Sequence, residues 1–510
     1  MLNAATLAKN AAKAHQANLK RMLDEGSIAR CSARSSDFSE GFHSFPVYMG
    51  TLLSENDTVH YEGGCFKSLD FSLKFHPNPE NYDSLTVTVR AKHAADWLCS
   101  DLFFISTLDK HHIEYAFFAT KHEVEFRNLD TEDRLDIALN GVRLFMFCDG
   151  MGDTLASALA TAKMFLGGLN HPLLPRGVPD YQEDAVLEFL ASSIGYEAEP
   201  RPIWDTDVVP EDFVRSGDAV LMTTFQGLNA LVMYGTGSLV GHSGIAMWIG
   251  DQLYVLESQS DMVWPREGVQ ANLFRTFKEW LRESDGHAIV LPLREDVRER
   301  FNASAALDFF LSINGMPYGM HNYLFGWLDT PISPWPALLP PEILPVLMGV
   351  LEGLSPEYAN ILVGEALNHR LGTRGLSLSE VAAEAARQGK TLAELYSVPE
   401  KDGWEYSDGY NYVCSSFVVG MYKAGGLFGD LEVQATEFGP RDLYMLDFFD
   451  KNASLPEGCL AADPDLPYCQ IYGKYRIRIP FEEYSSVTPY ANMNERCPAT
   501  PPNGGRLEGC

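Results

Sequence analysis

The chain has 510 residues, of which 46% are hydrophobic and 12% aromatic, enough for about two to four domains with buried cores. Its formal net charge is −30, from 69 acidic and 39 basic residues, so nucleic acid and anionic membrane surfaces are excluded as main partners. No apolar run has the length of a transmembrane helix, because the most apolar segment (WPALLPPEILPVLMGVLEGL, residues 335–354) contains four prolines and two glutamates.

The N-terminal residues 1–40 read as a helical arm. Their sequence begins MLNAATLAKNAAKAHQANLKRMLDEG, a polar amphipathic pattern without the apolar core of a signal peptide, which favours the cytoplasm. Nine cysteines and three N-x-S/T sequons, at Asn56, Asn302 and Asn452, favour the secretory route instead. We therefore expect a secreted or endolysosomal glycoprotein whose signal peptide is not visible in this sequence, with the cytoplasm as the alternative.

Residues 41–170 alternate between apolar and polar side chains in the manner of β-strands. The segments that carry the alternation are SLTVTVRAK, DLFFISTL, IEYAFFAT, HEVEFRNL and LDIALNGVRLFMFC. They predict a β-rich, sandwich-like accessory domain. The proline-rich stretch NHPLLPRGVPDYQED at 170–184 marks the end of that domain.

Residues 185–450 mix strand and helix patterns, which makes the whole chain α+β. GHSGIAMWIGDQLYVLESQ predicts a β-hairpin, HAIVLPL a strand and SAALDFFLSI a helix. An insertion at 326–403 is proline-rich first and helical afterwards. We expect it to be either a lid over a substrate or a structural annex.

The hairpin brings three polar residues together. If its turn is at Gly250–Asp251, Gly244 faces Glu257 and His242 faces Gln259. Because side chains alternate along a strand, His242, Glu257 and Gln259 then lie on one face. Directly opposed Cβ atoms are about 5 Å apart and diagonal ones about 7–8 Å. Either Glu257 or Gln259 could therefore hydrogen-bond one imidazole nitrogen of His242.

A single cysteine begins the helix predicted within NYVCSSFVVGMYKAGG (411–426). The Gly425–Gly426 pair predicts the end of this helix, and Cys414 is its first residue or N-cap. Unpaired amides and the helix dipole stabilise a thiolate there, and a histidine cation would lower the thiol pKa further. A buried structural thiol is the alternative reading.

Eight other cysteines leave Cys414 without a partner if they form four disulfides. The short loops favour pairing Cys459 with Cys469 and Cys497 with Cys510, although the sequence leaves other connectivities open. Residues 451–510 are thus predicted to be a disulfide-stapled, Cys- and Pro-rich tail. The eight cysteines are Cys31, Cys65, Cys99, Cys148, Cys459, Cys469, Cys497 and Cys510.

Five segments, in this order, resemble circularly permuted NlpC-like papain-fold cysteine hydrolases, the branch typified by YiiX and, more distantly, lecithin–retinol acyltransferase. They are SGDAVLM, TGSLVGHSGIAM, YVLES, MPYGMHNYLFGW and YNYVCSSFVVGMYKAGG, within roughly 212–446. The resemblance implies a papain-like catalytic domain with Cys414 as nucleophile, His242 as general base and acid, and Glu257 as the orienting group. Gln259 is a further candidate for orienting His242, and Tyr412 for oxyanion stabilisation.

The expected activity is cleavage of an amide or peptide bond through an acyl-enzyme, with bacterial cell-wall peptides as the implied substrate class. VCSSF lacks the Asn-Cys-Glu-His-Phe motif of the acyltransferase branch, which favours hydrolysis. A lipid acyl hydrolase or acyltransferase is the alternative enzyme, suggested by the apolar LLPPEILPVLMGVL. A non-catalytic binding protein with a degenerate papain-like domain is the other alternative.

No cofactor and no metal site are predicted. His111–His112 and the pair Glu365 and His369 have the chemistry of metal ligands, but neither shows a third ligand. Phosphate-binding and dinucleotide-binding motifs are also missing from the sequence.

Overall fold

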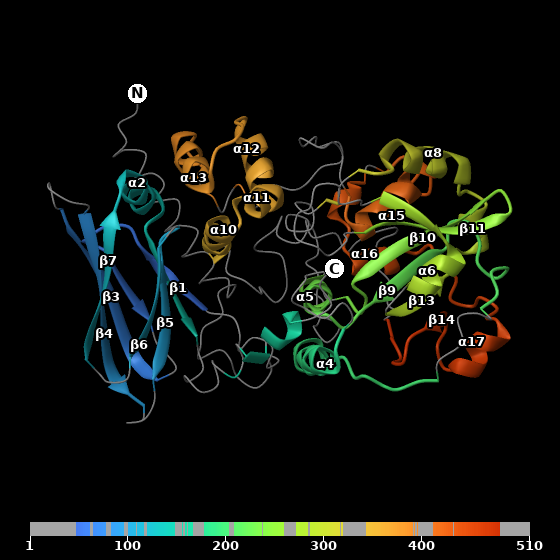
Figure 1. Cartoon of the computed structure of the whole chain (residues 1–510), viewed down its shortest axis with the longest axis horizontal. Coiled ribbons are helices and arrows are strands. Elements are labelled where there is room, and N and C mark those ends of the chain that lie inside the picture. Colours follow the sequence, from blue (N-terminus) through green and yellow to red (C-terminus); the bar gives the residue numbers. More distant parts are fainter. Residues whose placement is uncertain are drawn as a thin grey trace. The chain divides into compact units, whose positions relative to one another are not determined.

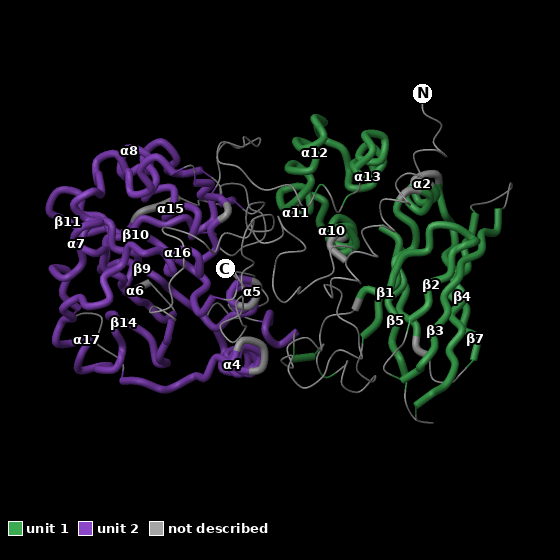
Figure 2. Tube along the Cα trace, turned by 180° about the vertical axis from the view of Figure 1, so that it is seen from behind, with its two compact units in different colours: residues 1–160, 337–398 green, residues 161–336, 399–510 purple. Residues whose placement is uncertain are grey.

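The computed structural model describes residues 47–479 apart from internal stretches, the longest being 148–155, 167–177, 203–208, 260–271, 320–342 and 396–411. The described residues form an α+β structure, and the chain divides into two compact units (Figures 1 and 2). Unit 1 comprises residues 1–160 and 337–398, and unit 2 comprises residues 161–336 and 399–510. The predicted arm at 1–40 lies outside the described residues.

Unit 1 contains two four-stranded antiparallel sheets, ordered β1-β8-β5-β6 and β2-β3-β4-β7. Their inner faces share one hydrophobic core, in which Phe71 of β3 meets Phe103 of β5 edge to face. Alternate burial along β4 shows the two-residue periodicity that the sequence indicated. The strands are β1 (Val47–Leu52), β2 (Thr58–Tyr61), β3 (Phe66–His76), β4 (Asp83–Ala94), β5 (Asp101–Ser106), β6 (His111–Ala116), β7 (Lys121–Leu129) and β8 (Val142–Phe147).

One of the strands predicted for this unit is wrong in its first half. The segment LDIALNGVRLFMFC does not form one strand: its beginning lies in helix α2 (Thr131–Asn140), and only the part after Gly141 forms β8. Asp130 accepts a hydrogen bond from the amide of Asp133, whose carboxylate accepts one from the amide of Asp130. This capping box starts a helix, and its local hydrogen bonds outweigh the strand pattern.

Residues 337–398, within the predicted insertion 326–403, belong to unit 1 and separate the two parts of unit 2 along the chain. Val346 of α10 is fully buried in the core of the two sheets, and α13 contacts α2. Val346 thus anchors α10 in the core of unit 1, whereas Leu347 of the same helix is 40% exposed. Its helices are α10 (Ile343–Leu354), α11 (Pro356–Ala359), the π-helical turn η4 (Asn360–Gly364), α12 (Glu365–Leu371) and α13 (Leu378–Arg387).

Unit 2 is built on a six-stranded antiparallel sheet with the order β12-β11-β10-β9-β13-β14. A second hydrophobic core combines this sheet with α6, whose Trp280 is 1% exposed. Helix α15 contacts β10 and β11 of the same sheet, and it also contacts α8 and α16 (Figure 1). The strands are β9 (Ala219–Thr223), β10 (His242–Ile249), β11 (Gln252–Ser258), β12 (Asn272–Thr276), β13 (His287–Leu291) and β14 (Cys469–Tyr472).

The helices of unit 2 include the predicted SAALDFFLSI helix as α8, and Asn302 caps its first turn by accepting from the amide of Ala305. None of the helices in the described parts of either unit is both long enough and apolar enough to span a membrane. The helices of this unit are α4 (Asp180–Ile194), α5 (Gly227–Thr236), α6 (Phe277–Glu283), α7 (Glu295–Arg298), α8 (Ala303–Ile313), α15 (Cys414–Ala424), the 3₁₀ turn η5 (Ala435–Glu437), α16 (Pro440–Tyr444) and α17 (Glu457–Ala462).

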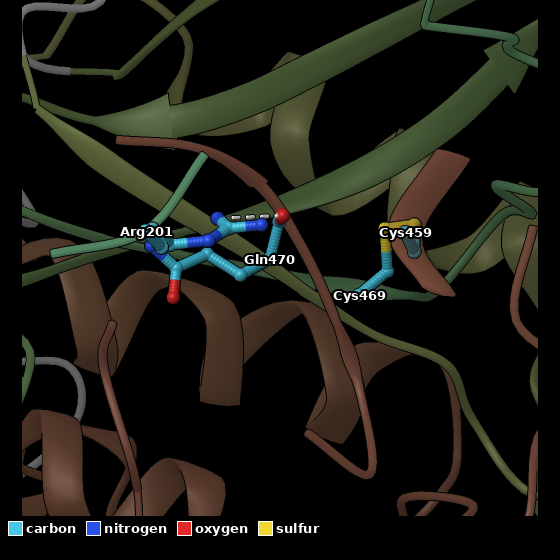
Figure 3. The surroundings of a disulfide bond; sticks show 4 residues. All are labelled: Arg201, Cys459, Cys469 and Gln470. Atoms are coloured by element: carbon cyan, nitrogen blue, oxygen red, sulfur yellow. Dashed lines mark hydrogen bonds between the residues drawn. A yellow bond between two sulfur atoms is a disulfide. The ribbon is translucent and has the colours of Figure 1, made fainter. Parts of the chain in front are cut away.

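The described part of the predicted tail is more regular than expected, because β14 joins the edge of the sheet beside β13. Cys459 of α17 and Cys469 form a disulfide, as the short loop suggested. Figure 3 shows this disulfide together with Arg201, whose Nη1 donates to the backbone oxygen of Gln470 at 2.9 Å. Pairing of β14 with β13 and the buried Arg201 thus attach the tail to the sheet, and the disulfide joins α17 to β14 within the tail. The predicted Cys497–Cys510 pair lies outside the described residues.

Candidate functional site

The β10–β11 hairpin has the register that the sequence predicted. Ile249 pairs with Gln252, which leaves Gly250 and Asp251 as the two-residue turn, and Gly244 pairs with Glu257. Gly250 has a φ of 65°, which glycine adopts without steric cost. This confirmed register decides which polar side chains of the two strands share a face.

His242 is the first residue of β10, and its imidazole is held by a buried carboxylate. Nε2 of His242 lies 2.7 Å from Oε2 of Glu257, a residue with no exposed surface. Gln259, the other candidate partner, has its Oε1 at 3.1 Å from Nη2 of Arg275. The structure therefore places Glu257 at the imidazole and Gln259 at a neighbouring arginine.

Three donors surround the carboxylate of Glu257. His242 and Trp280 face Oε2, with the indole Nε1 of Trp280 at 3.4 Å, and Arg275 forms an ion pair with Oε1. Burial raises the pKa of Glu257, but the hydrogen bonds and charges of His242 and Arg275 outweigh it and lower the pKa below its usual value. Glu257 is therefore an anion inside the protein.

Cys414 is the first residue of α15 and is buried. Val413 makes no side-chain cap, so the first-turn amides are open to the thiol. The two serines that follow are committed elsewhere: Oγ of Ser415 donates to the backbone oxygen of Phe438 at 2.7 Å, and Oγ of Ser416 to that of Val413 at 3.0 Å. Of these three side chains, the thiol of Cys414 is therefore the one that interacts with His242.

The imidazole of His242 and the backbone amides of Ser243 and Ser415 interact with the thiol of Cys414 and favour its thiolate form. Because Nε2 of His242 faces Glu257, Nδ1 is the ring nitrogen that remains for the thiol. Burial raises the pKa of Cys414, but the imidazole and the two amides lower it below the value of an ordinary thiol.

The pKa of His242 moves in the opposite direction. Burial lowers it, but the hydrogen bonds to Cys414 and Glu257 and the charges of both raise it to about 10. A lowered thiol pKa beside a raised imidazole pKa favours a thiolate–imidazolium pair. Cys414 is also the free cysteine among the described cysteines, since Cys65 is disulfide-bonded and Cys459 pairs with Cys469.

The backbone beside the thiol is packed closely. The backbone oxygen of Gly241 lies 3.9 Å from Sγ of Cys414. A Cβ on Gly241 would lie 1.8 Å from Oδ1 of Asn229, whose Nδ2 donates to Oγ1 of Thr223 and to the backbone oxygen of Thr224. A Cβ at position 241 would therefore require the side chain of Asn229 to move.

Tyr412, the candidate for oxyanion stabilisation, has its ring against Phe309, with the centroids 5.7 Å apart. Its backbone oxygen accepts a hydrogen bond from Oγ of Ser258 at 2.7 Å, which joins the segment before α15 to the end of β11. Tyr412 thus helps to fasten the cysteine helix to the histidine hairpin.

Sequence reasoning missed Arg275 and Trp280. Both follow residues 260–271, so their position relative to Glu257 depends on how β12 pairs with β11. The structure pairs Arg275 with Val255, two positions from Glu257 on the same face of the sheet. The sequence signal that was available is the strand-like NLFRT followed by the helix FKEWLRE.

The histidines considered as metal ligands in unit 1 have other contacts. Nδ1 of His111 lies 2.6 Å from Oγ of Ser106, and Nε2 of His112 lies 3.3 Å from Oε2 of Glu114. Within the described ranges, His, Cys, Asp and Glu side chains do not gather in groups of three that could hold a metal ion.

Comparison of the chain with protein-family models, with curated proteins and with solved structures gives no match.

Proposed function

We propose that unit 2 is a cysteine hydrolase that cleaves an amide or peptide bond. The observation that carries the proposal is the free thiol of Cys414 interacting with His242, whose Nε2 is held by the buried Glu257. A nucleophile, a base and a group that orients the base are the components of thiol-dependent acyl transfer.

The proposed reaction has two halves. The thiolate of Cys414 attacks the carbonyl carbon and forms a C–S bond, while the imidazolium of His242 gives its proton to the leaving nitrogen as the C–N bond breaks. The neutral imidazole then takes a proton from water. The resulting hydroxide attacks the thioester and releases the acid, and the thiolate and imidazolium are restored.

Backbone amides at the start of α15 are the proposed oxyanion donors. The amide of Cys414 is at the N-terminus of a helix without a side-chain cap. A donor of this kind contributes about 3 kcal/mol to the transition state in well-studied hydrolases. The dipole of α15 adds to it, since the positive end of the helix faces the developing charge.

The arrangement of the unit supports a circularly permuted papain-like fold as part of the proposal. The histidine strand β10 precedes the cysteine helix α15 in the chain, and α15 contacts the sheet through β10 and β11. This is the order that the resembling hydrolases have. The disulfides at Cys65 and between Cys459 and Cys469 support an oxidising compartment, in keeping with a secreted or endolysosomal protein.

Bacterial cell-wall peptides are the proposed substrate class. The apolar segment that suggested acyl lipids includes α10, and Val346 of α10 is buried in the core of unit 1. Gly349 of the same helix is in tight contact with the backbone of Leu108. These packing contacts give Val346 and Gly349 a structural role, which favours peptides over lipids.

Trapping the acyl-enzyme tests the proposal. The full chain, unreduced, is incubated with muropeptides or with acyl-lipids, quenched in acid and measured by intact mass and peptide mapping. We expect a peptidyl adduct on Cys414 with muropeptides, none with acyl-lipids, and none in Cys414→Ala. An adduct from acyl-lipids alone would establish the lipid hydrolase instead, and no adduct from either set, with no turnover, would contradict a hydrolase.

A further inference from the structure

Arg275 reaches the candidate site from an edge strand. It lies on β12 opposite Val255 of β11, while Glu257 lies opposite Leu273. Arg275 and Glu257 are therefore diagonal neighbours on one face of the sheet, a separation that a long side chain spans. Glu257 occupies the position between β10 and β12, with His242 on one side and Arg275 on the other.

The guanidinium of Arg275 holds two side chains of the β11 segment at once. Nη2 bonds Oε1 of Glu257 and also lies 3.1 Å from Oε1 of Gln259. The side chain of Arg275 is 23% exposed, whereas that of Glu257 is fully buried. Arg275 thus keeps some contact with solvent while it neutralises a carboxylate that has none.

We propose that Arg275 is a positioning residue of the candidate site, the permanent counter-ion that keeps Glu257 ionised and directed at Nε2 of His242 throughout the reaction. The inference rests on the proposed function, because it assigns a role within that same site.

The need for a second cation follows from the proposed reaction. His242 is an imidazolium at rest, but it becomes neutral once it has protonated the leaving group. Glu257 would then be a buried carboxylate without a counter-ion, and such a group tends to take up a proton. Arg275 cannot lose its proton in this range, so it holds the charge of Glu257 in both halves of the reaction.

The groups that face Glu257 within the described structure come from three elements. They are His242 from β10, Arg275 from β12 and the neutral indole of Trp280 from α6. Cys414 influences Glu257 through His242. The exposed Glu279 of α6 interacts electrostatically with Arg275. Arg275 is therefore the cation beside Glu257 that does not take part in proton transfer.

The pH profile of Cys414 alkylation by iodoacetamide tests the inference without a substrate. In Arg275→Met, Glu257 takes up a proton at mildly acidic pH and no longer supports the imidazolium, so the thiol keeps its proton to higher pH. The acid limb is the pH range over which the alkylation rate rises as the thiol ionises. We expect it to move up by about one pH unit, which lowers the alkylation rate at a given pH on that limb about tenfold. Arg275→Lys, which keeps the charge, should restore most of the rate.

Arg282→Met is the matched control, because Arg282 is exposed on α6 and donates to the backbone oxygen of Lys278. Its profile should match that of the wild type. Glu257→Gln and the double variant Glu257→Gln with Arg275→Met complete a double-mutant cycle. The neutral glutamine side chain also removes the buried charge that could prevent Arg275→Met from folding. If Arg275 acts through Glu257, these two variants have the same acid limb.

Each outcome decides between the inference and the proposed function. Suppose that the wild-type rate falls off only at low pH, as expected for a stabilised thiolate. If Arg275→Met has the same profile, or if the Glu257→Gln single and double variants have different profiles, the role of Arg275 is overturned and the hydrolase proposal stands. A wild-type profile with the pKa of an ordinary thiol overturns both.

Discussion

Glu257 and His242 lie on adjacent strands joined by a two-residue turn, and their side chains are in direct contact. Oε2 of the carboxylate is 2.7 Å from Nε2 of the imidazole. The contact fixes the orientation of the ring and leaves Nδ1 for the thiol of Cys414, which belongs to a helix far along the chain. The β10–β11 hairpin thus positions His242 and Glu257 of the candidate site, and α15 contributes Cys414.

Selective alkylation is the first expected outcome. Iodoacetamide should label Cys414 in the unreduced protein, because the described cysteines other than Cys414 are in disulfides. His242→Ala removes the imidazole that stabilises the thiolate and should slow labelling at neutral pH at least about tenfold. Peptide mapping by mass spectrometry measures both. Equal rates in the two proteins, or Cys414 in a disulfide, would contradict the proposed role.

The thiolate itself can be titrated by its ultraviolet absorbance, as the difference between wild type and Cys414→Ser. The pKa of Cys414 is lowered and that of His242 is raised to about 10, so the thiolate should persist well below the pH of ordinary thiol ionisation. In His242→Ala, burial of Cys414 becomes the largest influence on the thiol pKa, and burial raises that pKa. The thiolate transition should then move to a pH above that of an ordinary thiol, and a transition that stays where it was would refute the ion pair.

The close packing at Gly241 predicts a steric penalty. In Gly241→Ala the new Cβ would collide with Oδ1 of Asn229, which costs about 1–3 kcal/mol of unfolding free energy, as overpacking usually does. Denaturant unfolding measures the loss. Asn229→Ala removes the colliding side chain, so the double variant should be more stable than the sum of the two single changes implies. Simple additivity would mean that the collision is absent.

His287 predicts how stability depends on pH. Burial lowers the pKa of this histidine from 6.5 to about 4, and its Nε2 accepts a hydrogen bond from the amide of Tyr475 at 3.1 Å. Protonation would put a donor where an acceptor is needed. Because the folded state binds this proton less readily than the unfolded state, stability should fall as pH decreases from about 6.5 to about 4.

The loss is of the order of 3 kcal/mol across that window. His287→Gln, which does not titrate but can still accept the hydrogen bond, should flatten this part of the stability profile measured by denaturant unfolding. A wild-type profile that is already flat between these pH values would show that His287 titrates normally.

Much of the candidate site could be predicted because its halves are local. The turn at Gly250–Asp251 sets the register of β10 and β11, and a strand periodicity of two then puts His242 and Glu257 on one face. The same holds for α15, which begins at Cys414 and ends before Gly425. Where two local patterns competed, as in LDIALNGVRLFMFC, the capping box at Asp130 formed a helix that strand periodicity does not reveal.

The sequence by itself determined the hairpin register and the thiol at a helix start, because each depends on neighbours within a few residues. It favoured the short Cys459–Cys469 disulfide among several open connectivities, and the structure contains that pair. The tertiary structure alone decided that Cys414 meets His242, that Arg275 and Trp280 enclose Glu257, that β14 completes the sheet and that α10 packs into unit 1. These contacts join segments far apart in the chain, and they form because burial of apolar surface and pairing of buried charges select one packing among many that local patterns permit.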